Sequence, residues 1–567
     1  MDKITKNLLN DFSVRHDMNR LDESTQFEHF VNYSIISKLN RSSFELFDIH
    51  TGNGGDCAID GICLVVNGKI ITDIDELKEI VSNCGYLDAD IAFIQSKTSS
   101  SFSGSEVGSF IFGVKDFLSD DSQLVQNDRI KSVKLIWEEI ISMSRHMVNR
   151  RPCCRLFYVC TGQWVNDQNL QAIINNGKKE IASLSLFEEV SITPNGASEI
   201  GRLYQETKNR LSTTINFQNK ITLPDIEGVT QSYLGLVQFD EFIKLIQDDN
   251  QVIHNIFDDN VRDFQGENDV NKKIKETLSS KKFDLFCILN NGVTVVSSSL
   301  TAAGNKFTLR DYQIVNGCQT SHVLHECREM ADIQKVNVPI KIIVTESDDI
   351  KTEITLATNS QTAIKTEQLA SLNKFQRTLE DYFNSEADGI RLYYERRSQQ
   401  YNSSDKIKNV QIITIPIQIK SFASMFLESP HLVSGYYGTV VTRFSGEIFV
   451  NNHKCAAYFV SALCYFRIEQ FFRSCELSSE YKKARFHIMM IIKIIHIGTE
   501  RINSNKFEQK CESLKKELMD DAKALAIFKN SINIFKTSGI DLTKNRYKLE
   551  SETEMLREAA EEFKKKL

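Results

Sequence analysis

The stretch that decides the fold reads GNGGDCAIDGICLVVNGK over residues 52–69 and is followed by DADIAFIQSKTSS over residues 88–100. The first segment holds Asp60 in a Gly-rich turn that enters an apolar strand. The second is a strand that presents Gln95, Ser96 and Lys97 near its end. Because side chains alternate along a strand, Gln95 and Lys97 share one face, which can meet Asp60 across the sheet.

The surrounding sequence indicates a mixed α/β domain over residues 1–210. FEHFVNYSIISKL (27–39) places apolar residues at three- and four-residue steps, which predicts a helix carrying Glu28. Short β-like runs follow, beginning with ELFDIH (45–50). Further along, two helical patterns at 105–118 and 131–148 are followed by two strand-like runs at 154–162 and 188–193.

These side chains suit phosphodiester hydrolysis, which requires neutralising a developing negative charge and making water nucleophilic near neutral pH. Bound Mg²⁺, or Mn²⁺, can do both and prefers oxygen ligands. Asp60, the Gln95 amide oxygen, the Ser96 backbone carbonyl and Glu28 can supply those oxygens. Lys97 can orient or deprotonate the attacking water, or hold the scissile phosphate. The alternative is a turn aspartate and a strand-edge lysine on a solvated face.

At these residues the sequence resembles the PD-(D/E)xK nuclease superfamily, and in particular Mrr-type enzymes. In those enzymes a Gly-x-Asp-x-Gly-x-Asp turn precedes a Gln-x-Lys strand. Ala58 stands where Mrr-type proteins usually have Gly. The resemblance implies a restriction-endonuclease-like mixed sheet flanked by helices, and metal-dependent hydrolysis of nucleic acid, with DNA favoured over RNA. The family's functional positions fall on Asp56, Asp60, Gln95, Lys97 and, on the preceding helix, Glu28.

A second set of motifs lies further along the chain: NVRDFQGENDVNKKIKETL (260–278), LNNGVTVV (289–296), YQIVNGCQTSHVL (312–324) and YYERRSQQY (393–401). As a set these resemble the AIPR family, named for abortive infection and phage resistance. The resemblance spans roughly 220–445. Members often join this region to an N-terminal nuclease domain, so it implies bacterial defence against phage.

The second region is rich in polar turns, which predict a nucleotide or nucleic-acid site. Backbone NH groups at Gly turns, together with Asn and Gln amides, can cradle a phosphate or read a base edge. The candidates are Arg262, Asn291, Asn316 and Gln319. The same residues can instead cap turns and satisfy buried backbone.

Arg150 and Arg151 form a basic stretch beside the expected nuclease core. They are candidates for phosphate contact. A solvated face is the alternative.

LFCILNNGVTVVSSSL (285–300) and DYQIVNGCQTSHVL (311–324) each read as a strand running into a Gly-containing turn, and VPIKIIVTES (338–347) as another strand. We therefore expect a central mixed α/β recognition domain over 215–445 and a helical bundle over 450–567. Two apolar runs, 455–472 and 487–497, are interrupted by charges or too short to cross a membrane, and predict buried helices.

Composition indicates a folded protein, with 567 residues, 41% hydrophobic content and a net charge of -7. The thirteen cysteines are scattered and the start lacks a secretory pattern, which predicts free thiols in a reducing cytoplasm. Cutting duplex DNA needs two active sites, so we expect a homodimer. The alternative function is a nucleotide- or DNA-binding regulatory module whose nuclease site is degenerate or gated by a nucleotide.

Overall fold

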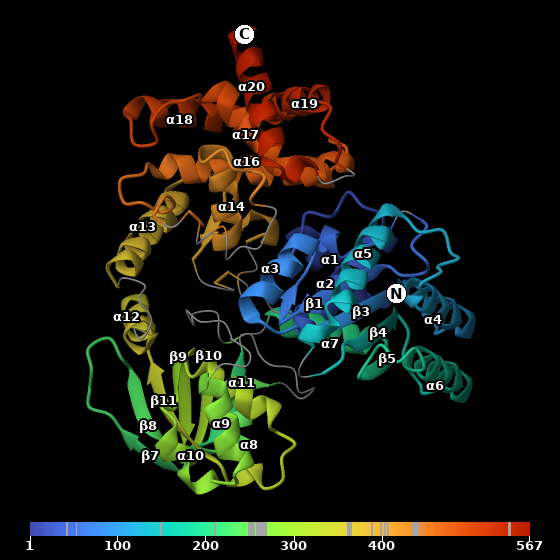
Figure 1. Cartoon of the computed structure of the whole chain (residues 1–567), viewed down its shortest axis with the longest axis vertical. Helices are drawn as coiled ribbons and strands as arrows, with labels where there is room; N and C mark the ends of the chain where they lie inside the picture. Colours follow the sequence, from blue (N-terminus) through green and yellow to red (C-terminus); the bar gives the residue numbers. More distant parts are fainter. Residues whose placement is uncertain are drawn as a thin grey trace.

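The amino-terminal part of the chain folds around a five-stranded mixed sheet in the computed structural model (Figure 1). The strand order is β2-β1-β3-β4-β5, in which β1 is antiparallel to both neighbours and β3, β4 and β5 are parallel. The strands are β1 (Gly61–Val66), β2 (Lys69–Ile70), β3 (Ala89–Lys97), β4 (Cys153–Cys160) and β5 (Glu189–Asn195).

The structure describes the whole chain except residues 41–43, 53, 148–149, 209–210, 248–255, 257–268, 360–365, 387–388, 397–399, 402–403, 405–406, 434–439, 441–442, 445, 543–545 and 567.

Helices cover both faces of this sheet, as expected for a mixed α/β domain. One core cluster joins α1, α2 and α7 to one face, and a second joins α3, α4, α5 and α6 to the other. β1 is buried along its whole length because both of its faces meet helices. The helices are α1 (Lys3–Arg15), α2 (Glu23–Leu39), α3 (Ile74–Cys84), α4 (Gly104–Leu118), α5 (Asp128–Ser142), α6 (Gln168–Ala182) and α7 (Ala197–Lys208).

The run ELFDIH differs from the sequence expectation. It forms a 3-10 turn, η1 (Leu46–Asp48), and only His50 makes a β-bridge, to Gly61. The apolar residues Leu46, Phe47 and Ile49 make this run resemble a short strand, but the backbone instead turns and brings His50 beside β1.

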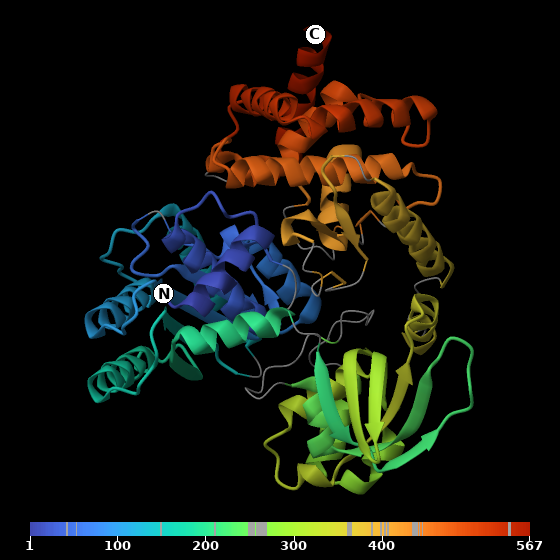
Figure 2. The same ribbon diagram turned by 180° about the vertical axis from the view of Figure 1, so that it is seen from behind.

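A six-stranded mixed sheet forms the central lobe, in the order β6-β10-β9-β11-β8-β7. Only β9 and β11 pair in parallel. Helices pack on one face, and Figure 2 turns the opposite face toward the viewer. The elements are β6 (Ser212–Asn216), β7 (Asn219–Thr222), β8 (Gln231–Gln238), α8 (Phe239–Ile246), α9 (Asp269–Ser279), α10 (Phe286–Leu289), β9 (Val293–Ala303), β10 (Lys306–Asn316), α11 (Cys318–Glu326) and β11 (Asn337–Val344).

The expected strand at 338–347 is confirmed by β11, whereas residues 286–289 form the short helix α10 rather than a strand. In the run LFCILNNGVTVVSSSL (285–300), the strand is β9, which starts at Val293 and therefore follows the Asn-Gly turn instead of preceding it.

The carboxy-terminal part of the chain is helical. Figure 1 shows α12 and α13 running from the central lobe toward it. One core cluster extends from Phe375 to Ala560, so it takes in helices that precede residue 450. The elements are α12 (Asp348–Asn359), α13 (Thr366–Ser385), β12 (Tyr393–Glu395), β13 (Ile412–Thr414), α14 (Ile415–Phe426), α16 (Cys455–Arg473), η6 (Ser479–Ala484), α17 (Arg485–His496), α18 (Asn505–Met519), α19 (Asp521–Thr537) and α20 (Glu550–Lys566).

The two apolar runs are buried helices of this bundle, as predicted. In α16 the interrupting charges are paired: Arg467 with Asp521 at 2.7 Å, and Glu469 with Arg485 at 3.0 Å. Such pairing offsets the desolvation of buried charges. Within the described ranges, we find no helix whose length and apolar character would let it cross a membrane.

Candidate active site

Asp60 lies at the entrance to β1, where the sheet brings it against the end of β3. Its buried carboxylate oxygen Oδ2 accepts three hydrogen bonds, from Gln95 Nε2 at 2.8 Å, Ser96 N at 2.7 Å and Ser96 Oγ at 3.1 Å. The Asp60 backbone N–H donates to the carbonyl of Ile94 at 2.8 Å. Antiparallel pairing of Gly61 with Ile94 therefore sets the contact between Asp60 and Gln95.

The turn before Asp60 is held by close packing. Asp56 accepts a hydrogen bond from the Ala58 N–H at 3.0 Å, and Cys57 and Ala58 both have φ of 58°. This left-handed region favours Gly, so Ala58 occupies a backbone conformation that Gly would adopt at lower cost. On α4, a Cβ at Gly113 would lie 1.8 Å from the Cys57 carbonyl oxygen, so only Gly permits this approach.

Glu28 reaches the same region from α2. One turn further along this helix, Asn32 donates from Nδ2 to the Asp60 backbone carbonyl at 3.2 Å, which fixes α2 over the turn. Glu28 Oε2 lies 2.7 Å from His50 Nε2. The helix begins at the N-cap Asp22, whose side chain accepts from the Ser24 and Thr25 N–H groups.

Burial and the neighbouring charge of Glu28 raise the pKa of Asp60 to about 7. The Ser96 N–H and the Lys97 ammonium act in the opposite direction but do not cancel the effect. Two carboxylates and a lysine therefore influence one another electrostatically at the ends of β1 and β3. A carboxyl with this raised pKa holds its proton more readily than an exposed aspartate, so a cation that binds there must displace that proton.

The polar groups around Asp60 suit a hard cation. Gln95 Oε1 is buried and has no hydrogen-bond partner among the described residues. Asp60, Glu28 and the Ser96 carbonyl supply further oxygens of the kind that Mg²⁺ prefers. In the part of the chain that the structure describes, no group of three or more His, Cys, Asp or Glu side chains is placed to hold a metal. The predicted ligand set contains two carboxylates and completes its oxygens with amide and carbonyl groups.

Several residues at this site were not identified from the sequence. Tyr158, opposite Gln95 in the register of β3 and β4, donates from its hydroxyl to Glu106 Oε2 at 3.0 Å. Glu106 lies in the first turn of α4, which follows β3 and the Ser-rich loop after it. His50 was also missed. Its polar, titratable side chain two residues before the Gly-rich turn is the sequence signal that could have identified it.

Arg150 and Arg151 lie at the opposite end of β3 from Lys97. Arg150 pairs with Asp88 at 2.5 Å and with Asp90 at 2.9 Å, beside the start of that strand. Seven residues of extended strand, about 23 Å, separate Asp90 from Lys97. Arg151 donates to the carbonyl of Ser185 at 2.9 Å. The structure thus does not bring these arginines to the Asp60 site.

The Asn-Gly turns of the central lobe come together. Gly292 and Gly317 have φ of 78° and 99°, and a Cβ on Gly317 would lie 3.0 Å from the Gly292 carbonyl oxygen. Asn291 is exposed just before β9, and Asn316 ends β10 opposite Thr294. Gln319 follows in the first turn of α11. Arg262, the fourth candidate, lies outside the described residues.

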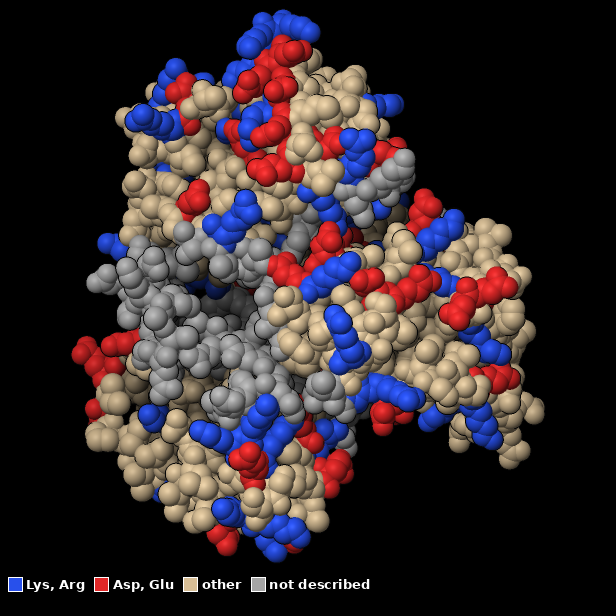
Figure 3. Space-filling model, viewed as in Figure 1, with Lys and Arg blue, Asp and Glu red and all other residues tan. Residues whose placement is uncertain are grey.

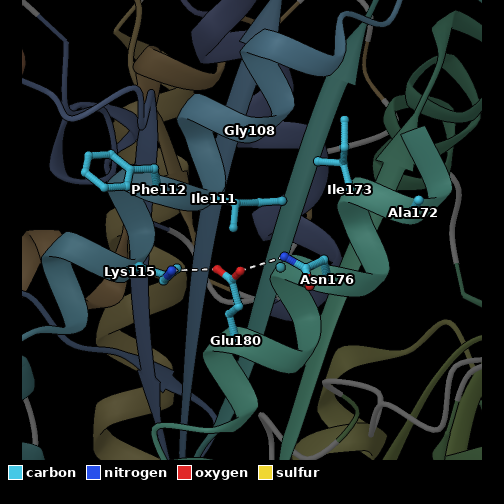
Figure 4. Close-up of a pocket in the computed structure, with 9 residues that line it drawn as sticks. Gly108, Ile111, Phe112, Lys115, Ala172, Ile173, Asn176 and Glu180 are labelled. Carbon is cyan, nitrogen blue, oxygen red and sulfur yellow. Dashed lines mark hydrogen bonds and ion pairs between the residues drawn. The ribbon is translucent and has the colours of Figure 1, made fainter. Parts of the chain in front are cut away.

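A separate groove of about 400 Å³ lies between α4 and α6 (Figure 4). Its apolar wall comprises Ile111, Phe112 and Ile173, and Lys115 pairs with Glu180 at 2.5 Å. None of the residues that line it is a predicted site residue. The candidate chemistry therefore lies at the ends of β1 and β3 rather than in this groove.

The chain matches the model of a known family. The model of the family described as AIPR protein matches residues 257–562, more than half of the 567-residue chain. The matched stretch begins after the sheet that carries Asp60 and takes in β9 to β11 and the helical bundle. Comparisons with curated proteins and with solved structures give no match.

Proposed function

This chain belongs to the AIPR family, and from that premise we propose that it is a phage-defence nuclease whose amino-terminal domain hydrolyses nucleic-acid phosphodiester bonds. Family membership implies a role in abortive infection and phage defence. The nuclease activity is our proposal. The observation that carries it is the convergence of Gln95 and Ser96 on the buried carboxylate of Asp60, with Glu28 and Lys97 close enough to shift its pKa.

The domain architecture supports a restriction-endonuclease-like fold. Helix α2, which bears Glu28, precedes the antiparallel pair of β1 and β3, and helices α4 and α5 then lead to β4, which is parallel to β3 on its far side. The acidic turn and the Gln-x-Lys strand stand at adjacent ends of β1 and β3, as the PD-(D/E)xK resemblance requires.

We assign metal binding to Asp60, Gln95, Glu28 and the Ser96 carbonyl. When bound there, Mg²⁺ or Mn²⁺ would neutralise developing charge and acidify water. Asp60 is held for this task by its three donors, which leave its other carboxylate oxygen for the cation. The side-chain carbonyl of Gln95, buried without a hydrogen-bond partner among the described residues, would gain a favourable contact from the same cation.

Lys97 is assigned the role of orienting the attacking water or the scissile phosphate. It ends β3, and its side chain is only half-buried, next to the buried Gln95 and Ser96. A partly exposed ammonium beside a buried acidic site can contact a substrate phosphate from the solvent side.

Double-stranded DNA is our proposed substrate, cut by a homodimer in the bacterial cytoplasm. Figure 3, which shows the molecule from the side seen in Figure 1, has Lys and Arg interspersed with Asp and Glu over its described residues. With a net charge of -7, phosphate binding must rely on local groups such as Lys97 rather than on a chain-wide basic surface.

The decisive experiment compares Mg²⁺-dependent DNA cleavage by the wild type, Lys97→Ala and Lys115→Ala. Lys115 belongs to the same domain but pairs with Glu180 in the α4–α6 groove, so it controls for the loss of a lysine. We expect Lys97→Ala to lose activity by at least about a hundredfold and Lys115→Ala to retain it. Equal cleavage by all three proteins would refute the catalytic assignment.

A regulatory module that binds a nucleotide is the second candidate, favoured by the two Asn-Gly turns that pack side by side. Backbone NH groups at such turns can bind phosphate. Calorimetry with nucleoside triphosphates tests it, and Asn316→Ala should weaken the binding. Absence of cleavage by the wild type, together with such binding, would favour this function over the nuclease.

A further inference from the structure

The segment Glu45–Thr51 contacts both the candidate active site and the carboxy-terminal helices. It includes η1 and the bridge residue His50. Neither its 3-10 turn nor its contacts with the helical bundle are part of the resemblance that identified the site. Its two ends make different contacts, and together these link distant parts of the chain.

At the site end, three contacts tie the segment to the candidate catalytic groups. His50 Nε2 lies 2.7 Å from Glu28 Oε2. The Thr51 N–H donates to the Asp60 carbonyl at 3.1 Å, and the Ile62 N–H donates to the Ile49 carbonyl at 3.0 Å. A shift of this segment would therefore displace Glu28 and the Asp60 turn together.

At the other end, residues of the helical bundle hold the segment. The Tyr465 hydroxyl on α16 donates to Glu45 Oε1 at 3.0 Å. Lys482 Nζ lies 3.9 Å from Asp48 Oδ1 and 5.0 Å from the centre of the Phe47 ring. Both Tyr465 and Lys482 belong to the stretch that matches the AIPR family.

The segment between these ends is packed tightly enough to transmit a displacement. Leu46 and Ile49 are buried, and the buried ring of His29 on α2 lies against Phe47 and His50, at centroid distances of 4.7 and 4.3 Å. Packed side chains of this kind move as a unit because they leave no free volume. Figures 1 and 2 both show the amino-terminal domain beside the helical bundle, consistent with these contacts.

We propose that Glu45–Thr51 couples the AIPR-matching helical bundle to the candidate active site, with His50 as the positioning residue that holds Glu28. This inference rests on the proposed nuclease function, because the groups that the segment holds, Glu28 and Asp60, are the metal ligands assigned there. An event that moves α16 or η6 would change how Glu28 and Asp60 face each other, and would thereby regulate the site.

Substitution at His50 tests the positioning role through Mn²⁺ binding measured by calorimetry. His50→Ala should raise the Mn²⁺ dissociation constant about tenfold, since the Glu28 carboxylate loses its hydrogen bond with the His50 ring. His50→Gln retains a donor that can reach Glu28 and should recover most of the affinity. Wild-type affinity in His50→Ala, or no recovery in His50→Gln, would overturn the positioning role.

The coupling itself is tested by hydrogen exchange across residues 45–62 in the full-length chain. Tyr465→Phe removes the hydroxyl that donates to Glu45 and keeps the ring. The matched control is Tyr382→Phe, since the Tyr382 hydroxyl donates to Glu512 at 3.1 Å within the bundle itself. We expect the amides of residues 45–62 to exchange about fivefold faster in Tyr465→Phe than in the wild type, and at the wild-type rate in Tyr382→Phe.

The two proposals fail in different ways. If the wild type neither binds Mn²⁺ nor cleaves DNA, the nuclease function is refuted, while exchange in Tyr465→Phe still decides the coupling. If wild-type exchange rates persist in Tyr465→Phe, the coupling is refuted whatever the enzymatic result.

Discussion

Replacing Asp60 by asparagine should stabilise the metal-free amino-terminal domain while abolishing its response to metal. The carboxyl is buried, and its pKa is raised from 3.8 to about 7. The folded state therefore holds the proton more tightly than the unfolded state, and ionising Asp60 opposes folding. Asparagine keeps an acceptor oxygen for the Ser96 and Gln95 donors but carries no charge.

The size and sign of the effect follow from this pKa difference. Stability from the bound proton is fully present below about pH 4, and is lost as pH rises through about 7. A difference of about three pKa units corresponds to about 4 kcal/mol. Between about pH 4.5 and about pH 8, the advantage of Asp60→Asn over the wild type should therefore grow by about 3 kcal/mol.

The two tryptophans of the chain, Trp137 and Trp164, both lie in the amino-terminal domain, so their fluorescence follows its unfolding in the intact protein. Urea unfolding with a chelator would be measured for the wild type and Asp60→Asn at both pH values. Asp116→Asn is the control: its buried carboxylate accepts from the Gln123 and Leu124 N–H groups, so this substitution should destabilise by about 1–2 kcal/mol.

Added Mn²⁺ completes the test. At a hundred times its dissociation constant it should stabilise the wild type and Asp116→Asn by about 2.7 kcal/mol, and Asp60→Asn by almost nothing. A stability difference between Asp60→Asn and the wild type that did not change with pH would refute the electrostatic reasoning. Equal stabilisation of all three proteins by Mn²⁺ would refute Asp60 as a ligand.

The remaining predictions use the same fluorescence and binding assays. Gly113→Ala should destabilise the domain by about 2–4 kcal/mol, because its Cβ would collide with the Cys57 carbonyl. Gly108→Ala on the same helix is the control: its Cβ would meet nothing within 4 Å, so it should stabilise the domain by up to about 1 kcal/mol. Similar losses of stability in both variants would contradict the close approach of Gly113 to Cys57. Mn²⁺ should bind about tenfold more weakly at about pH 6 than at about pH 8, since Asp60 must lose its proton to coordinate, and a flat profile in calorimetry would argue against this ligand. Arg150→Met should destabilise the domain by about 1–2 kcal/mol, because it removes the cation from Asp88 and leaves Asp90 only the longer contact with Arg155 at 3.7 Å. It should leave Mn²⁺ binding unchanged, and weaker metal or DNA binding at unchanged stability would instead support a substrate contact.

The placement of Gln95 beside Asp60 was predictable from the sequence because it depends on local regularities. Alternation along β3 and a turn entering β1 limit which side chains meet, and the helical period places Glu28 on α2. The buried helices at 455–473 and 485–496 were equally accessible, since their apolar runs contain charges that a membrane would reject.

What the sequence did not reveal depends on contacts between distant segments. His50 appeared to belong to a strand, because Leu46, Phe47 and Ile49 form a short apolar run before it, but the backbone forms a 3-10 turn. Arg150 appeared free to bind phosphate because its partners lie about sixty positions earlier in the chain. Tertiary packing, rather than local pattern, decides such cases.

The amino-terminal domain is attached to the helical bundle by side-chain contacts as well as by the polypeptide, which passes through the central lobe on the way. Lys548, just before α20, pairs with Asp73 at 2.5 Å and with Asp75 at 2.7 Å, and Lys408 lies 3.4 Å from Asp17. The chain is thus closed into a ring by noncovalent bonds. A single proteolytic nick within the central lobe would leave both outer fragments associated, and they would co-elute under native conditions until salt or denaturant released them.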